Sequence, residues 1–247
     1  MRKFNENFQS EEGNVLFLIL IAVALFAALS YAVTQSGGSG SGSAGEETNL
    51  IRGAQLTQYP SNVKQAVTRM LIGGGIAKQD IVFDPPSNFS TDLDTDTKKS
   101  EAVFHPNGGG APFQKEAKLG SDVVAGEWKY VGTEAVKNLG TNKPELMMFA
   151  AKIPTGICQS VNDRVGLPTD FTATEVDAGI DYESMTTIEY DSSGSVTGDE
   201  LTTGTVTASE QIGNSATALA NQRFGCTTAK NDGVDNDLIY FQVLATQ

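Results

Sequence analysis

Residues 15–33 read VLFLILIAVALFAALSYAV, and this stretch decides how the rest of the chain is organised. It contains no charged residue, and its first polar side chain is Ser30, so the apolar surface continues around the whole helix. As an α-helix it rises about 28 Å, which matches the hydrocarbon core of a bilayer. A core helix of a soluble protein shows polar residues every third or fourth position instead. The sequence therefore predicts a transmembrane helix at residues 14–35.

The basic residues on either side of this helix predict its orientation. Arg2 and Lys3 precede it, and the next basic residue after it is Arg52. Lysine and arginine are enriched on the cytoplasmic side of membrane helices, so we expect a cytoplasmic amino terminus and an exported domain. A cleaved secretory signal is the alternative, with the small residues of AALSYA, residues 27–32, as its cleavage region.

A short polar leader, residues 1–13, ends in Gly13, and Asn14 then opens the apolar helix. This arrangement at the head of an exported domain resembles the type IV pilin and pseudopilin class. In that class a prepilin peptidase cuts after the glycine, and the freed helices of many subunits pack into a filament. The resemblance implies cleavage between Gly13 and Asn14, and it implies a single-pass protein of the bacterial inner membrane. The domain would then lie in the periplasm or outside the cell.

Two positions depart from the usual pattern of that class. Basic residues usually precede the glycine, whereas Glu11 and Glu12 stand there in this chain. The fifth mature residue is usually a glutamate, and Leu18 takes its place. Some minor pseudopilins lack that glutamate, so the resemblance implies a minor subunit rather than a major one.

The rest of the chain predicts a linker followed by one domain. Residues 36–45, SGGSGSGSAG, have no side chain that can build a core and predict a flexible coil, although engineered linkers have the same composition. Residues 46–72 have apolar side chains at three- and four-residue spacing and predict an amphipathic helix. Pro60 inside this pattern predicts a kink or two short helices.

The domain at residues 46–247 has the element order of an α+β fold, with a helix packed on an antiparallel sheet. Thr155 and Gly166 bound a second helix as cap and stop. Residues 186–207 predict hairpins or an exposed loop, and residues 212–219 predict a short helix. The β-prone runs predict strands at residues 81–83, 102–104, 123–131, 146–151 and 238–244, the last of them central.

Charge and cysteine content limit the possible functions of this domain. The net charge of the chain is -13, which repels nucleic acid, so no nucleic-acid partner is expected. Cys158 and Cys226 are the only cysteines, and an even count in an exported domain favours a disulfide over two buried thiols. Many pilins also carry a disulfide in the carboxy-terminal part, and the resemblance implies the same bond.

Metal binding and catalysis have few candidate residues. Asp232, Asp235 and Asp237 lie in the loop NDGVDND, residues 231–237, where they predict either a calcium site or an acidic, solvated turn. Some pseudopilins bind calcium in a carboxy-terminal loop. Residues 92–96, DLDTD, begin like an EF-hand, but Thr97 and Val103 stand where that loop needs glycine and glutamate.

His105 is the only histidine, and no nucleophile motif or Cys-x-x-Cys pair accompanies it. We therefore expect His105 to be a turn residue. We expect no enzymatic activity and no cofactor apart from the possible calcium. The expected function is that of a pilin-like structural subunit, whose partners are the membrane, other pilin-like subunits and a prepilin peptidase. A permanently anchored periplasmic binding or adhesion domain is the alternative.

Overall fold

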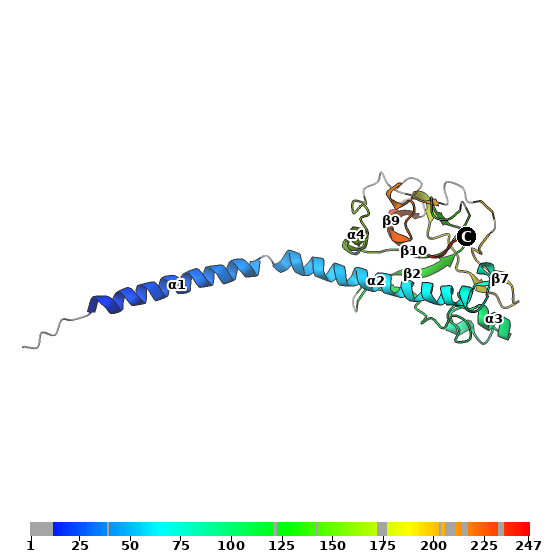
Figure 1. Ribbon diagram of the computed structural model, residues 1–247, viewed down its shortest axis with the longest axis horizontal. Coiled ribbons are helices and arrows are strands. Elements are labelled where there is room, and N and C mark those ends of the chain that lie inside the picture. The colour runs from blue at the N-terminus through cyan, green and yellow to red at the C-terminus, as the bar shows by residue number, and fades with distance from the viewer. Residues whose placement is uncertain are drawn as a thin grey trace, which may run out of the picture. The chain divides into compact units, whose positions relative to one another are not determined.

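The computed structural model describes residues 12–38, 40–120, 123–141, 143–171, 177–202, 204–205, 211–213, 217–231 and 235–247. Two compact units divide the chain, Met1–Glu47 and Thr48–Gln247. Figure 1 follows the chain in colour from helix α1 to strand β10. The first unit contains the apolar helix, and the second contains the sheet.

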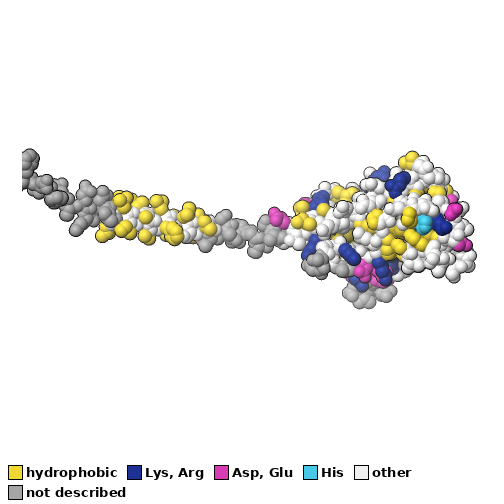
Figure 2. Space-filling model, turned by 90° about the horizontal axis from the view of Figure 1, so that it is seen from below, with side chains coloured by type: hydrophobic (Ala, Val, Ile, Leu, Met, Phe, Trp, Pro, Cys, Tyr) yellow, Lys and Arg dark blue, Asp and Glu magenta, His cyan; other side chains and the backbone are white. Residues whose placement is uncertain are grey.

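Helix α1, Glu12–Gly38, contains the apolar stretch. Leucine and alanine are strong helix formers, and no proline or glycine interrupts residues 15–35. Every large apolar side chain from Leu16 to Val33 is exposed, by 41% to 73%, and Figure 2 shows them as an apolar surface. Among the described residues, α1 alone is long and apolar enough to cross a membrane, with a mean hydropathy of 2.7 over Leu16–Val33.

The Gly/Ser stretch at residues 36–45 differs from its prediction. The sequence predicts a flexible coil, whereas the structure has helix up to Gly38 and again from Gly40. Glycine and serine have low helix propensity, so the composition of this stretch does not predict the helical ends of α1 and α2. Residue 39 lies outside the described part of the chain.

Helix α2, Gly40–Ile72, passes through Pro60 as one helix rather than as two short ones. A proline inside a helix costs about 3 kcal/mol, and burial of each large apolar side chain returns about 1.5–3 kcal/mol. Gly75 has a φ of +66° and turns the chain away just past the end of α2. The buried face of α2 consists of Leu56, Tyr59, Val63, Ala66, Val67 and Met70.

This face of α2 packs on a sheet of six strands in the order β1-β2-β4-β10-β9-β5. All neighbouring strands are antiparallel except β5 and β9, which are parallel. The predicted strands at residues 123–131, 146–151 and 238–244 are confirmed as β2, β4 and β10, and β10 lies inside the sheet. The bounds are β1 Glu116–Lys118, β2 Val124–Val131, β4 Leu146–Ala150, β5 Asp177–Asp181, β9 Phe224–Asn231 and β10 Asp235–Ala245. The α+β fold with a helix on an antiparallel sheet is therefore confirmed.

Both faces of the central strands are buried, which explains their nearly continuous apolar sequence. In β4, Leu146 and Met148 face the cluster that contains the α2 side chains, whereas Met147 and Phe149 face a second cluster. The alternation follows from the two-residue period of a strand. The sheet thus separates two hydrophobic cores.

The remaining elements are short and partly differ from prediction. Residues 81–83 and 102–104 form only an isolated parallel bridge between Val82 and Ala102. Residues 186–207 contain a hairpin, as predicted. Of the short helix predicted at residues 212–219, the described residues form a strand end at Ile212 and a 3-10 turn at Thr217–Leu219, and residues 214–216 lie outside the described part. The elements are α3 Asp96–Glu101, α4 Thr155–Arg164, β3 Ala135–Val136, β6 Glu189–Tyr190, β7 Val196–Thr197, β8 Gln211–Ile212, η1 Lys78–Asp80, η2 Pro86–Asn88 and η4 Thr217–Leu219.

Candidate functional site

The disulfide between Cys158 and Cys226 is confirmed, with 5.5 Å between the two Cα atoms. Cys158 lies in α4, which begins after Pro154, so Thr155 is a first-turn residue rather than the predicted cap. Cys226 lies in β9, a strand that the sequence did not predict. Both cysteines are fully buried, and the bond fixes α4 to the sheet.

The predicted processing residues, Gly13 and Asn14, lie in the first turn of α1. Nothing in the fold tests cleavage between them, so it stays a prediction.

The predicted calcium residues lie at the turn between β9 and β10. Asp232 lies outside the described residues, and of Asp235 only the backbone is described, in β10 opposite Asn231. Asp237, also in β10, is opposite Ala229. Within the described ranges, no three side chains of His, Cys, Asp or Glu are grouped so that they could hold a metal ion. The calcium site therefore stays a prediction.

Two carboxylates of the second acidic motif, residues 92–96, form ion pairs with lysines of α3. Asp94 pairs with Lys98 at 2.9 Å, and Asp96 pairs with Lys99 at 3.5 Å. Thr95 accepts a hydrogen bond from the Lys98 backbone N–H at 3.3 Å and caps α3. These contacts use residues 94–96 to start a helix rather than to surround a cation.

His105 lies in a turn, as predicted. Its Nδ1 accepts a hydrogen bond from the Asn107 backbone N–H at 3.1 Å, and its ring meets the Phe89 ring edge-on with 4.8 Å between centroids. Burial lowers the pKa of His105, and the charge of Lys99 lowers it further. The His105 ring nitrogen therefore acts as a hydrogen-bond acceptor that shapes the turn.

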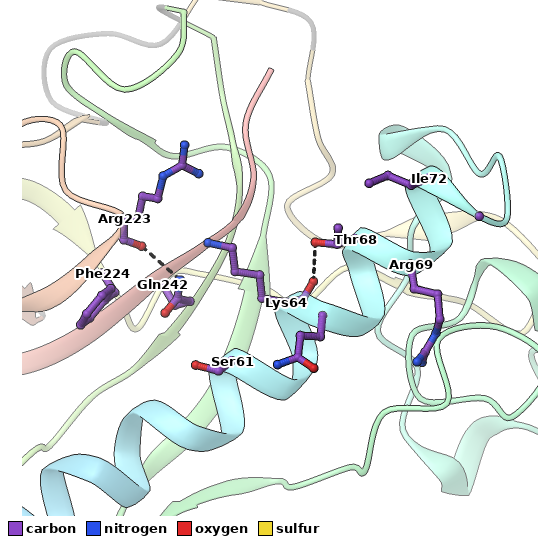
Figure 3. A pocket seen from close by; sticks show the side chains of 10 residues that line it. Ser61, Lys64, Thr68, Arg69, Ile72, Arg223, Phe224 and Gln242 are labelled. Atoms are coloured by element: carbon purple, nitrogen blue, oxygen red, sulfur yellow. Dashed lines mark hydrogen bonds between the residues drawn. The ribbon is translucent and has the colours of Figure 1, made fainter.

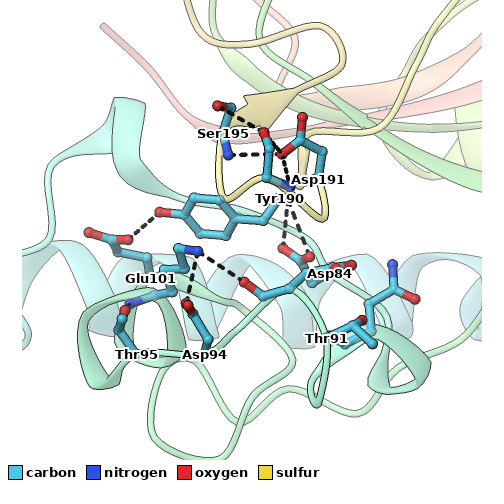
Figure 4. Close-up of polar contacts among 12 residues, drawn as sticks. Asp84, Thr91, Asp94, Thr95, Glu101, Tyr190, Asp191 and Ser195 are labelled. Carbon is cyan, nitrogen blue, oxygen red and sulfur yellow. Dashed lines mark hydrogen bonds and ion pairs between the residues drawn. The ribbon is translucent and has the colours of Figure 1, made fainter.

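A network of polar contacts joins the β6–β7 hairpin to α3 and to the segment around Asp84 (Figure 4). Asp84 is fully buried, and both of its carboxylate oxygens accept from the Tyr190 backbone N–H at 3.2 Å. The Tyr190 hydroxyl donates to Glu101 at 2.5 Å, and the Lys98 ammonium lies 5.1 Å from the Tyr190 ring centroid. Every polar group named here has a protein partner, which is typical of a structural network.

Two carboxyl groups in this region have raised pKa values. Burial raises the pKa of Asp84 to about 6, and the hydrogen bond from Tyr190 partly opposes that rise. Burial also raises the pKa of Glu189 to about 7, with the charges of Asp84 and Asp92 adding to it. This network is therefore a source of pH-dependent stability.

A concave surface lies between α2 and the strands β9 and β10, and we call it the α2 groove. Its volume is about 710 Å³, within the range of ligand sites. Figure 3 shows α2 along one side and Arg223, Phe224 and Gln242 on the other. The groove is lined by Ser61, Lys64, Gln65, Thr68, Arg69, Ile72, Gly73, Arg223, Phe224 and Gln242.

All ionisable residues that line the α2 groove are basic: Lys64, Arg69 and Arg223. Burial lowers the pKa of Lys64, and the charge of Arg223 lowers it further. Arg69 points away from these two in Figure 3, and its guanidinium donates to the backbone oxygen of Gly109. Lys64 and Arg223 therefore form the positive part of the groove.

The sequence did not predict this groove. Lys64 and Arg223 are far apart in the chain, and only the packing of α2 beside the start of β9 brings them to one surface. The sequence did contain a signal for one wall of the groove. Ser61, Lys64 and Thr68 follow helical spacing, which places them together on the exposed side of α2.

No family profile, no curated protein and no solved structure matches this chain.

Proposed function

We propose that the chain is a pilin-like or pseudopilin-like structural subunit of a type IV pilus or type II secretion-type filament. We assign it a minor rather than a major role, because Leu18 stands where a major subunit usually has a glutamate. The proposed role involves no catalysis. The proposed partners are other pilin-like subunits and a prepilin peptidase.

The observation that carries the proposal is the combination of two helices in one chain. The large side chains of α1 from Leu16 to Val33 are apolar and exposed, so they need lipid or other helices as neighbours. Helix α2 packs one apolar face on an antiparallel sheet, and a disulfide closes the carboxy-terminal part of that domain. An anchor helix, a helix on a sheet and a late disulfide together are typical of pilin-like subunits.

The proposal places α1 in the bacterial inner membrane before assembly, with the leader in the cytoplasm and the sheet domain in the periplasm or outside the cell. Small residues in the second half of the span, Ala27, Ala28, Ser30 and Ala32, permit close approach of neighbouring helices. Subunit helices can then replace lipid around α1. Leu18 makes these contacts apolar throughout.

The test is replacement of the glycine before the cleavage site. Gly13→Leu should block the peptidase, so electrophoresis of cell membranes should show a longer form than the wild type. A matched change outside the site, Ser10→Leu, should leave the processed length unchanged. Equal lengths for wild type and Gly13→Leu would contradict the proposal.

A permanently anchored periplasmic binding or adhesion domain is the second candidate, and the α2 groove is the observation that favours it. A concave surface with two cations is a binding feature that a purely structural subunit does not need. This candidate predicts that the protein keeps its full length in cells and stays in the membrane fraction.

A further inference from the structure

The α2 groove carries an inference that goes beyond a structural role and does not depend on filament formation. Within the described part of the chain, neither the Lys64 ammonium nor the Arg223 guanidinium forms an ion pair. Glu145 is near enough for the charge of Arg223 to lower its pKa, but burial dominates and raises that pKa to about 7. Two neighbouring cations thus share a concave surface without a carboxylate partner.

The charge of the groove is opposite to that of the chain. The protein has a net charge of -13, yet no acidic residue lines this surface. Partial burial and the repulsion from Arg223 disfavour the charged form of Lys64, as its lowered pKa indicates. The attraction of a bound anion would offset both penalties, because it would supply the missing opposite charge.

The shape of the groove favours an extended ligand over a compact ion. Its lining on α2 extends from Ser61 to Ile72, a rise of about 16 Å at about 1.5 Å per residue. An extended peptide covers that length with about five residues. Ile72, 82% exposed, and the partly buried Phe224 give the same surface an apolar part.

We propose that the α2 groove binds an extended acidic segment of a partner polypeptide. Lys64 and Arg223 pair with its carboxylates, and Ile72 and Phe224 contact an apolar side chain beside them. The exposed Gln65 amide can donate to and accept from the peptide backbone. The Thr68 hydroxyl donates to the Lys64 carbonyl at 2.8 Å, and its oxygen can accept from the peptide. A charge-assisted pair at a partly buried site is stronger than one at an open surface.

The test uses the full chain in non-ionic detergent and two fluorescein-labelled peptides. The first is Ser-Asp-Ser-Asp-Ser-Leu-Ser, in which both aspartates and the leucine lie on one side of an extended chain, and the second has asparagine in place of each aspartate. Fluorescence anisotropy at low salt should show at least about tenfold tighter binding of the aspartate peptide. The double variant Lys64→Gln with Arg223→Gln should bind both peptides equally weakly. The matched control, Lys118→Gln with Lys143→Gln, removes two exposed lysines outside the groove and should bind as the wild type does.

Charge reversal keeps the test decisive if the first variant is altered in its fold. Lys64→Glu with Arg223→Glu should lose the aspartate peptide and gain affinity for a version with lysine in place of aspartate. Three results would overturn the proposal: equal binding of the aspartate and asparagine peptides by the wild type, displacement by equimolar sulfate, or binding of phosphatidylglycerol vesicles through Lys64 and Arg223 without peptide binding. The last two would assign the groove to small anions or to lipid.

Discussion

The side-chain amide of Asn162 in α4 pairs with the backbone of Cys226 in β9 as a neighbouring strand would. Its Oδ1 accepts from the Cys226 N–H at 2.8 Å, and its Nδ2 donates to the Cys226 carbonyl at 3.0 Å. Among the described residues, strand β5 pairs with β9 only at Ala229 and Lys230, so at Cys226 the Asn162 amide takes the place of a strand partner. Asn162 is 1% exposed, and its amide thus satisfies a buried strand edge.

The first prediction concerns this pairing. Asn162→Ala leaves two buried backbone groups of Cys226 without partners, at a cost of about 1–3 kcal/mol each. We expect the free energy of unfolding to fall by about 3 kcal/mol in guanidinium titrations of the full chain in detergent. The fluorescence of Trp128, the single tryptophan, reports the transition. Asn62→Ala, on the exposed side of α2, is the control and should change stability by less than about 0.5 kcal/mol. Equal effects of the two variants would rule out the pairing as a source of stability.

The second prediction concerns the disulfide beside it. The bond between Cys158 and Cys226 closes a loop with a sequence separation of 68, which stabilises by about 4 kcal/mol in the chain-entropy model. The double replacement of both cysteines by alanine should lower stability by that order and make unfolding insensitive to reductant. Because Asn162 holds the same strand, adding Asn162→Ala should give a loss that differs from the sum of the two. Strict additivity would show that the two contacts act independently.

The third prediction concerns pH. Burial raises the pKa of Glu145 to about 7, and it likewise raises those of Glu189 to about 7 and Asp84 to about 6. Between their ordinary values and these raised ones, the folded protein holds more protons than the unfolded chain, so stability falls as pH rises from about 4.5 to about 7. The Tm should therefore be higher at pH 5 than at pH 8. His105 contributes in the opposite direction, because its pKa is lowered.

Glu145→Gln isolates the contribution of one of these three groups. The Glu145 side chain is 0% exposed, and one of its oxygens accepts from the Val136 N–H at 3.2 Å, which glutamine can also do. The variant should reduce the change in Tm between pH 5 and pH 8, and it should raise the Tm at pH 8. A slope unchanged from the wild type between pH 5 and pH 8 would contradict the assignment.

The fourth prediction concerns the contact between α2 and α4. A Cβ atom on Gly53 would lie 2.4 Å from the Ser160 Oγ, which donates to the Asn49 carbonyl at 2.9 Å. Gly53→Ala should therefore destabilise the protein by about 1–3 kcal/mol, although alanine favours helix. Adding Ser160→Gly should restore most of the loss. Gly45→Ala, in the same helix with nothing within 4 Å, should be neutral or stabilising, and a loss there equal to that of Gly53→Ala would exclude the steric explanation.

The elements that the sequence predicted correctly are those with strong patterns of their own. Strand β4 and residues 238–244 of β10 are nearly continuous apolar runs because a hydrophobic cluster covers each face of the sheet there. The apolar stripe of α2 marks the face that packs on the sheet. Strand β9, FGCTTAKN, was missed because its small and polar residues carry no such pattern. Its place in the sheet comes from pairing with β10 and from contacts with α4.

The candidate site was less predictable because its residues likewise have no shared pattern in the sequence. Cys158 and Cys226 were paired correctly because they are the only two cysteines. Lys64 and Arg223 give no joint signal in sequence, since their proximity depends on how α2 lies against β9 and β10. Residues 81–83 and 102–104 look like strands because they are apolar, yet they are buried largely without a sheet.

The most direct measurement of the central claim is the amino-terminal residue of the mature protein from native cells. Mass spectrometry of the intact protein and of its amino-terminal peptide identifies that residue without any substitution. A pilin-like subunit predicts Asn14 as the first residue, with residues 1–13 removed. An intact Met1 on the mature protein would contradict the account, and a first residue near Ala32 would instead identify a secretory signal.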